Sequence, residues 1–245
     1  MERKMTQQLT IVPGLCDSTA RLGVPDAFRL FMDIAGEHAE TIGVGAAAMQ
    51  ARGLFWLTVR TMIRFHRRPV LAEHAALATF PGIPGKARCM RYYTLTQGEA
   101  LLCEGKTEWA VLETGTGRLH PMQGVYPEEL ELTDETVCDG AFSRIQEDFS
   151  GDELLETYRV RSTDIDLGGH MNNAAYIRML FGALPTSRLH ALHIREAEAC
   201  FRAPCFENDL LTLRCRETAA GLELGAIRQD GKTAMLLALR TEENA

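Results

Sequence analysis

Apolar residues in the first half of the chain follow two periodicities, which predict a helix followed by strands. In residues 24–42 they recur at three- and four-residue steps, with Pro25 near the start and Gly43 at the end. This spacing is typical of a helix with a wide apolar face. Segments rich in β-branched and aromatic residues come next, separated by Gly and Pro, and they predict strands near residues 54–66, 73–81, 87–97 and 101–113.

The second half repeats this order. We expect a short strand over residues 157–162 and a helix from about Asn172 to Leu184, which Pro185 stops. Further strands are predicted near residues 191–202, 209–217, 222–229 and 233–241. A helix followed by consecutive strands, twice, without strand-helix-strand alternation, predicts an α+β fold in which an antiparallel sheet wraps each helix.

An acidic segment separates the two halves. Residues 128–156 contain eleven Asp and Glu side chains, with Arg144 as the only Lys or Arg. Like charges keep such a segment solvated and extended. We therefore predict an N-terminal domain over residues 1–126, an acidic linker over 127–155 and a C-terminal domain over 156–245.

Composition restricts the class of protein further. A hydrophobic share of 46% is ample for a packed core, and the formal charge of -7 argues against non-specific nucleic-acid binding. The N-terminal segment MERKMTQQLT has no apolar stretch, and no segment approaches the roughly 18 consecutive apolar residues of a membrane span. These features predict a soluble, cytoplasmic protein that does not bind membranes.

The seven cysteines form an odd set without CxxC pairs or the Cys/His spacing of a zinc site. We expect reduced thiols, most of them buried as small apolar residues. Basic residues, by contrast, cluster. Residues 60–91 contain seven Lys and Arg side chains and a single acid, Glu73. This cluster either forms the solvated edge of a strand or meets an acidic partner.

The richest chemistry lies in the run TDIDLGGHMNNAAY, residues 163–176, where the predicted strand meets the second helix. A helix N-terminus offers unpaired N–H groups and a positive dipole end, which stabilise developing negative charge. Gly168 and Gly169 have no Cβ, so a substrate carbonyl can approach their amides closely. The simpler explanation is a capped helix, with Asp166 or Asn172 as the cap.

The concurrence of these residues favours the functional explanation, because DxDxxGHxNNxxY resembles the signature of hot-dog thioesterases. The run DIDLGGHMNNAAYIRML, with DAFRLFMDIAGEHAETIGVG, FWLTVRTMIRF and KTEWAVLETGTGRLHPM in the first half, is similar to the acyl-ACP thioesterases of plants and bacteria. The resemblance implies a tandem hot-dog fold, hydrolysis of fatty acyl-ACP in fatty acid biosynthesis, acyl carrier protein as the partner, and no metal or organic cofactor.

Carried over residue by residue, Asp166 matches the catalytic aspartate of that family and His170 its catalytic histidine. The start of the family's second helix is matched by Asn172, Asn173 and Tyr176. We expect Asp166 to activate water or attack the acyl carbon, and His170 to orient the reacting groups. The amides near Gly168, Gly169 and His170 would stabilise the oxyanion.

Two positions depart from the family pattern. Gly168 stands where the family usually has Asn, and Pro204 and Cys205 stand where it has a strand Glu, often followed by Cys. Cys205 is therefore either a candidate nucleophile or a buried strand thiol. Glu198 and Glu207 are nearby candidates to replace the missing glutamate.

The resemblance places the acyl chain in the N-terminal half, between helix and sheet. Phe31 and Trp56 are candidate substrate-binding residues there, and other candidate walls are Phe28, Met32, Ala35 and Trp109. Each side chain also has the spacing of ordinary core. Within the basic cluster, the candidate contacts for acyl carrier protein are Arg60, Arg64, Arg67 and Arg68.

Two rival functions remain open at this level. An acyl-CoA thioesterase would share Asp166, although no segment resembles a nucleotide-binding loop. A non-catalytic acyl-thioester binder would fit the loss of the family Asn and Glu, but retention of Asp166 and His170 argues against it. Two fused halves are compatible with a monomer or a homodimer.

Overall fold

The computed structural model describes residues 2–241. The chain divides into two compact units, Met1–Gly140 and Ala141–Ala245, referred to below as unit 1 and unit 2. The boundary falls inside the segment 127–155 that the acidic run marks as a joining segment. Because each unit has its own helix and its own sheet, the two are described separately.

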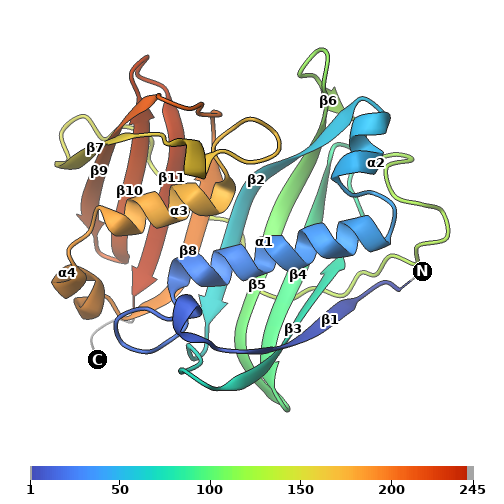
Figure 1. The fold of residues 1–245 in the computed structure, drawn as a ribbon, viewed down its shortest axis with the longest axis horizontal. Helices are drawn as coiled ribbons and strands as arrows, with labels where there is room; N and C mark the ends of the chain where they lie inside the picture. The colour runs from blue at the N-terminus through green and yellow to red at the C-terminus, as the bar shows by residue number, and fades with distance from the viewer. Residues whose placement is uncertain (1, 242–245) are drawn as a thin grey trace. The chain divides into compact units, whose positions relative to one another are not determined.

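Unit 1 is a long helix that lies across one face of an antiparallel sheet (Figure 1). The helices are α1 (Val24–Thr41) and α2 (Ala46–Ala51), after a 3-10 turn at Pro13–Leu15. The strands are β1 (Met5–Thr10), β2 (Leu54–Phe65), β3 (His74–Pro81), β4 (Arg88–Gln97), β5 (Ala100–Glu113) and β6 (Leu119–His120). Their order in the sheet is β1-β3-β4-β5-β2, with β6 beside β5.

Close packing of α1 on this sheet depends on an aromatic stack and a glycine. The ring of Phe31 stacks on Tyr93 of β4, with ring centroids 4.7 Å apart and planes 8° from parallel. Gly105 of β5 is the register partner of Tyr93. A Cβ on Gly105 would lie 2.5 Å from the Phe31 ring and 2.8 Å from the Met62 carbonyl oxygen, so only glycine fits beneath the ring.

Unit 2 repeats the plan with a shorter helix. Its helices are α3 (Asn173–Gly182) and α4 (Thr186–Ala191), after a 3-10 turn at Ser162–Asp164. Its strands are β7 (Glu153–Arg159), β8 (Ile194–Phe201), β9 (Leu210–Thr218), β10 (Gly221–Arg228) and β11 (Thr233–Thr241). The order is β8-β11-β10-β9-β7, with antiparallel neighbours, and α3 lies across one face (Figure 1).

Both predicted helices and most predicted strands are confirmed, while some elements differ. The strand predicted over residues 157–162 is β7, which runs over Glu153–Arg159 and gives way to the 3-10 turn. Three short elements and one edge strand were not predicted: α2, α4, β6 and β1. Strand β1, MTQQLT, is polar and only half-buried, so its sequence carries little apolar alternation.

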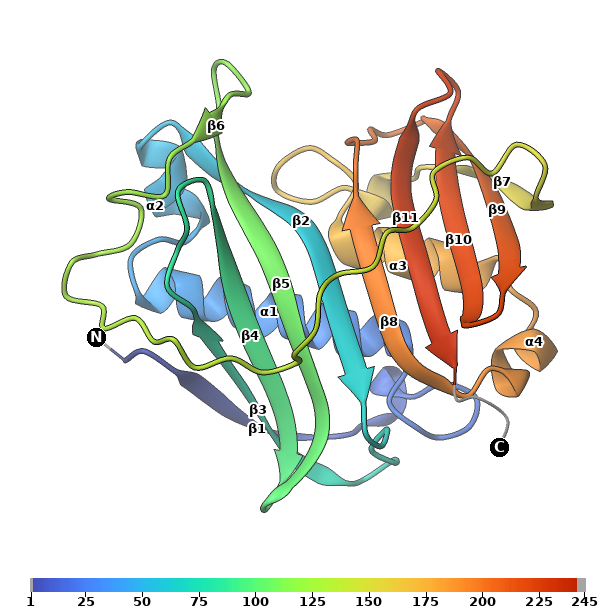
Figure 2. The same cartoon turned by 180° about the vertical axis from the view of Figure 1, so that it is seen from behind.

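The joining segment is anchored and not simply solvated as its charges predict. Its acids are exposed or partly exposed, but Leu130, Cys138, Ile145 and Phe149 are buried. It crosses the faces of the two sheets opposite α1 and α3 (Figure 2). Between these anchors the charged residues still face solvent.

Phe149 is the clearest of these anchors. Its ring lies against β10, where a Cβ on Gly225 would come within 2.8 Å of it. The guanidinium of Arg216 lies 3.8 Å from the ring centroid, in the geometry of a cation–π contact. The segment is therefore held to unit 2 by a ring seated between a glycine and an arginine.

Cysteine chemistry and membrane features are simple in the described residues. All seven cysteines are reduced as expected, six of them buried and Cys16 partly exposed. Within residues 2–241 no helix combines the length and apolar character needed to cross a membrane. In the same range, no group of three His, Cys, Asp or Glu side chains is arranged to hold a metal ion.

The stack on Gly105 predicts a stability effect. Gly105→Ala should lower the free energy of unfolding by about 1–3 kcal/mol, because the added methyl overpacks the contact with Phe31. Urea denaturation measures this change. Gly115→Ala, where the added methyl meets nothing within 4 Å, is the matched control and should stay close to the unmodified chain. Equal stability of the two variants would contradict this account of the stack.

Candidate active site

The candidate site is a tight turn that precedes α3. The N–H of Asp166 donates to the His170 carbonyl at 2.9 Å, and the N–H of Gly169 donates to the Asp166 carbonyl at 3.0 Å. Gly169 has φ 76°, a conformation that favours glycine. Leu167, at the tip of the turn, is fully exposed. The backbone thus holds Asp166 and His170 at the two ends of one short loop.

The two aspartates of the motif have different environments. Asp164 is buried, and its Oδ2 accepts hydrogen bonds from the Tyr158 hydroxyl at 2.8 Å and the Arg161 N–H at 2.9 Å. Burial and this bond to Asp164 raise the pKa of Tyr158 to about 12. Asp164 therefore fixes the 3-10 turn, a structural role that the sequence alone does not separate from that of Asp166.

Asp166 is exposed and only partly engaged. Its Oδ1 accepts a hydrogen bond from the Gly168 N–H at 2.8 Å, while Oδ2 has no hydrogen-bond partner among residues 2–241. A Cβ on Gly168 would lie 3.1 Å from Asp166 Oδ1 and 3.5 Å from His170 Nδ1. The position where the family usually has Asn therefore lies beside both candidate catalytic groups, and here glycine leaves that space open.

His170 is partly buried at the other end of the turn. Its ring lies 5.1 Å from the ring of Phe206, centroid to centroid, at an interplanar angle of 52°. Phe206 belongs to the loop between β8 and β9 and was not among the predicted site residues. The backbone N–H of His170 has no acceptor within the described part of the chain. That N–H is available to a developing negative charge.

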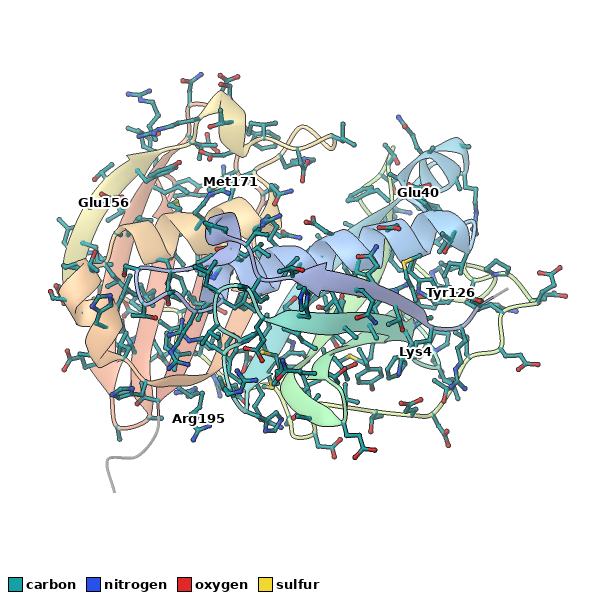
Figure 3. All side chains as sticks on the ribbon, turned by 60° about the horizontal axis from the view of Figure 1, so that its bottom comes forward. Lys4, Glu40, Tyr126, Glu156, Met171 and Arg195 are labelled. Atoms are coloured by element: carbon teal, nitrogen blue, oxygen red, sulfur yellow. The ribbon has the colours of Figure 1, made fainter. Side chains whose placement is uncertain are left out.

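The start of α3 is built as predicted for a capped helix. Asn172 is the N-cap, and its Oδ1 accepts a hydrogen bond from the Ala174 N–H at 2.8 Å. Asn173 is the first helical residue. Tyr176 is buried, and its hydroxyl donates to the Ala203 carbonyl at 3.4 Å. Met171, labelled in Figure 3, connects the turn to this helix start.

Cys205 lies next to the turn but is closed off from solvent. It belongs to the loop after β8 and not to a strand, so that part of the prediction is wrong. Its carbonyl accepts a hydrogen bond from the Met171 N–H at 2.8 Å, and the residue is 0% exposed. Burial raises the pKa of the Cys205 thiol, against the opposing effect of its hydrogen bond with Tyr176. A buried, protonated thiol is a poor nucleophile.

The two glutamates considered as replacements for the family Glu lie in different places. Glu198 is buried, and its Oε2 accepts bonds from the Ser143 N–H at 2.8 Å and the Ser143 hydroxyl at 2.5 Å. It therefore anchors the joining segment. Glu207 is exposed in the turn before β9, next to Phe206.

The candidate acyl-chain residues lie in the interior of unit 1. Phe28, Phe31 and Ala35 are buried on α1, and Met32 is partly buried. Trp56 and Trp109 are partly exposed and meet edge to face, with centroids 6.1 Å apart. The Trp56 Nε1–H donates to the Val44 carbonyl at 2.8 Å. Their use as walls for the acyl chain stays a prediction.

The four arginines predicted to contact acyl carrier protein all have acidic partners inside unit 1. Arg60 pairs with Glu108 at 3.1 Å and Arg64 with Glu104 at 3.2 Å. The pairs of the other two predicted contacts are Arg67 with Glu73 and Arg68 with Asp17. The cluster therefore carries less unpaired charge than its sequence indicates. Its use as a carrier-protein contact stays a prediction.

Solved structures with the same architecture exist. The chain is similar to an acyl-ACP thioesterase from Bacteroides thetaiotaomicron, at 20% identity, with 98% of each chain covered and a TM-score of 0.88. It is also similar to the 12:0-ACP thioesterase from Umbellularia californica, at 15% identity, with 99% of this chain and 98% of the other covered and a TM-score of 0.83. These likenesses show the predicted tandem hot-dog fold.

The family follows from the sequence profile. The acyl-ACP thioesterase N-terminal domain matches residues 2–130, and the acyl-ACP thioesterase C-terminal domain matches residues 149–240. The chain belongs to the acyl-ACP thioesterase family.

Curated relatives agree with this assignment. A dodecanoyl-[acyl-carrier-protein] hydrolase of Umbellularia californica chloroplasts is 23% identical over 224 residues, covering 84% of this chain and 58% of that protein. A chloroplastic oleoyl-acyl carrier protein thioesterase of Coriandrum sativum is 19% identical over 207 residues, covering 75% and 54%. The chain spans about half the length of the curated relatives it matches.

The Arg67–Glu73 pair predicts an acid-dependent loss of stability. The hydrogen bond from Arg67, followed by that from the Val70 N–H, lowers the pKa of Glu73 from 4.5 to about 2. Since the folded pKa is below the unfolded one, this pair stabilises the fold above about pH 4.5 and loses that effect as the pH falls toward 2. The stability gap between the unmodified chain and Glu73→Gln should therefore shrink over that range in urea denaturation.

Glu99→Gln, at an exposed acid in the turn between β4 and β5, is the control for this series. It should follow the unmodified chain at every pH. A Glu73→Gln gap that stays constant from pH 6 to pH 3 would show that the pair does not account for the acid response.

Proposed function

We propose that the chain hydrolyses the thioester of a fatty acyl chain carried on acyl carrier protein, releasing the fatty acid and the carrier. Membership of the acyl-ACP thioesterase family supports the reaction class and the donor. One observation carries the assignment of the site. The exposed carboxylate of Asp166 is held through Oδ1 by the Gly168 N–H and leaves Oδ2 open, beside His170 at the start of a helix.

The reaction needs a nucleophile at the acyl carbon and stabilisation of the resulting oxyanion. In one route, Oδ2 of Asp166 takes a proton from water, whose oxygen adds to the acyl carbon. In the other, Oδ2 adds directly, and water later cleaves the mixed anhydride. In both routes the carbon–sulfur bond breaks when the tetrahedral intermediate collapses, and the pantetheine thiolate leaves.

The oxyanion requires N–H donors that are not already engaged. Three amides were expected to hold the oxyanion. The Gly168 N–H donates to Asp166 Oδ1 and the Gly169 N–H to the Asp166 carbonyl, so the His170 N–H is the better candidate. The positive end of the α3 dipole adds to the stabilisation. The imidazole of His170 orients the water or the thioester from the opposite end of the turn.

The first test is an acyl-ACP series from C8 to C18 with Asp166→Asn. Turnover should fall at least about 100-fold, because the carboxylate is lost while its size is kept. Thermal stability should change little, since Asp166 is exposed. Asp164→Ala is the control and should show the reverse pattern, with lower stability because the oxygen that accepts from Tyr158 and Arg161 is lost.

Full turnover by Asp166→Asn would overturn the assignment of this carboxylate. Matching acyl-CoAs run beside the acyl-ACPs test the donor. If only acyl-CoA is hydrolysed, the chain is an acyl-CoA thioesterase. If acyl-ACP binds but no thioester is cleaved, the chain is a binder. Turnover in ¹⁸O-water tests direct attack, because water that cleaves the mixed anhydride at the Asp166 carbonyl leaves ¹⁸O in the peptide that contains Asp166, whereas the general-base route never labels it.

The buried state of Cys205 gives a further prediction. Cys205→Ala should retain turnover of the same order, because the thiol is buried and protonated and does not reach the substrate. A thiol reagent added to the native protein should modify the partly exposed Cys16 first, without loss of activity. Inactivation that tracks modification of Cys205, as located by peptide mass spectrometry, would restore Cys205 as the nucleophile.

A further inference from the structure

A row of polar side chains crosses the interior of unit 1, where the family resemblance places the acyl chain. Arg91 of β4 is the register partner of Thr107 on β5, and Thr107 is the partner of Thr61 on β2. Thr79 of β3 and His38 of α1 complete the group, and all five are at most 4% exposed. Arg91 shares its face of the strand with Tyr93, which stacks on α1. The polar row therefore faces the helix.

Arg91 has no acidic partner within the described residues, unlike the four arginines predicted to contact acyl carrier protein. Its Nη1 donates to His38 Nδ1 at 2.9 Å and to the Thr79 hydroxyl at 3.3 Å. Burial lowers the pKa of His38, so the imidazole is neutral, and its Nε2 bonds the Glu2 carbonyl at 3.0 Å. Within residues 2–241, no carboxylate pairs with Arg91, and no acceptor pairs with its Nε or Nη2. Buried charges are normally paired, because an unpaired one is costly.

Two more buried polar groups lie beside this row. The Tyr93 hydroxyl lies close enough to Thr107 and to the Trp109 Nε1–H to interact with both, but neither it nor the Trp109 Nε1–H makes a hydrogen bond of ordinary geometry within the described residues. The hydroxyls of Thr61 and Thr107 bond each other at 2.9 Å. Guanidinium and indole groups only donate. The Trp109 Nε1–H and the remaining N–H groups of Arg91 therefore have no acceptor of ordinary hydrogen-bond geometry within the described residues.

The surroundings of the row are apolar on both sides. Toward one end lie Phe31, Ile63 and Leu95, which are fully buried. Toward the other, Val111 and Cys89 belong to an apolar cluster against which Trp56 and Trp109 pack. The ring of Trp109 is partly exposed, although its Nε1 is buried. A chain that lies in this interior thus passes from apolar walls to a group of donors and again to apolar walls.

We propose that this donor group binds an oxygen atom carried by the acyl chain of the substrate, a hydroxyl, an oxo group or a carboxylate. The inference rests on the proposed thioesterase function and names its substrate class, an oxygen-bearing fatty acyl chain. A hydrocarbon tail offers no acceptor to the Tyr93 hydroxyl, the Trp109 Nε1–H or the Nε and Nη2 of Arg91. Sites built to hydrogen-bond a substrate oxygen discriminate strongly against analogues that lack it. A carboxylate also supplies the missing counter-ion for Arg91.

The test compares acyl-ACPs of matched length, from C8 to C16, with a plain end, a terminal hydroxyl or a terminal carboxylate. At the best length, kcat/KM for an oxygen-bearing chain should exceed that for the plain chain by at least about tenfold, which equals about 1.4 kcal/mol. Arg91→Met should reduce this ratio most for the carboxylate, and Tyr93→Phe most for the hydroxyl. Arg88→Met, on the same strand but exposed and paired with Glu108, should keep the ratio.

If Arg91→Met does not fold, Tyr93→Phe still decides the test, because it removes one hydroxyl and keeps the aromatic ring. A plain chain that is hydrolysed as well as both oxygen-bearing chains overturns the inference while leaving the proposed function intact. A ratio that neither variant changes also overturns it.

Binding without turnover is followed by the intrinsic fluorescence of the two tryptophans of the chain, both of which lie in this interior. The probes are methyl dodecanoate, methyl 12-hydroxydodecanoate and the monomethyl ester of dodecanedioic acid, in which the blocked head group leaves only the far end of the chain different. If no thioester is cleaved but an oxygen-ended ester binds more tightly, in a manner lost in Arg91→Met or Tyr93→Phe, the proposed function fails and the oxygen site stands. Equal binding of all three esters overturns the site.

Discussion

Each sheet of this protein has an apolar face that a single helix must cover. This requirement sets the rest of the architecture, because an uncovered sheet face of this size exposes a large apolar surface to water. In unit 1, the 18-residue α1 satisfies it through residues such as Phe31, whose ring rests on Tyr93 above a glycine. In unit 2, the 10-residue α3 does so. The start of α3 is therefore fixed in place by packing, and the turn before it inherits that position.

In the turn before α3, the two aspartates of the motif have different roles. Asp164 points inward and holds the 3-10 turn through Tyr158 and Arg161, whereas Asp166 points to solvent with one oxygen restrained. Two identical side chains two residues apart thus have opposite roles because one is buried and the other is not. The loop after β8 supports the same turn by two contacts. Its Cys205 carbonyl accepts a hydrogen bond from the Met171 N–H, and its Phe206 ring packs against His170.

The sequence predicted the repeated helix-and-sheet plan and the place of the turn, because long apolar periods and a dense motif are local signals. It did not predict β1, whose pairing with β3 depends on the sheet edge and not on its own apolar content. The match to the family pattern placed Cys205 on a strand, whereas it is a single buried residue in the largely exposed loop between β8 and β9. The polar row around Arg91 also escaped prediction, because an arginine in a strand gives no sign that it faces inward.

Phe149 and Gly225 form a coupled pair across the contact that holds the joining segment to unit 2. The ring of Phe149 occupies the space that any side chain at position 225 would need. Substitutions at the two positions are therefore not additive, since a smaller residue at 149 opens room for a larger one at 225. Along an evolutionary path the order matters: position 149 has to shrink first, and a gain of volume at position 225 before that step displaces the joining segment from the sheet.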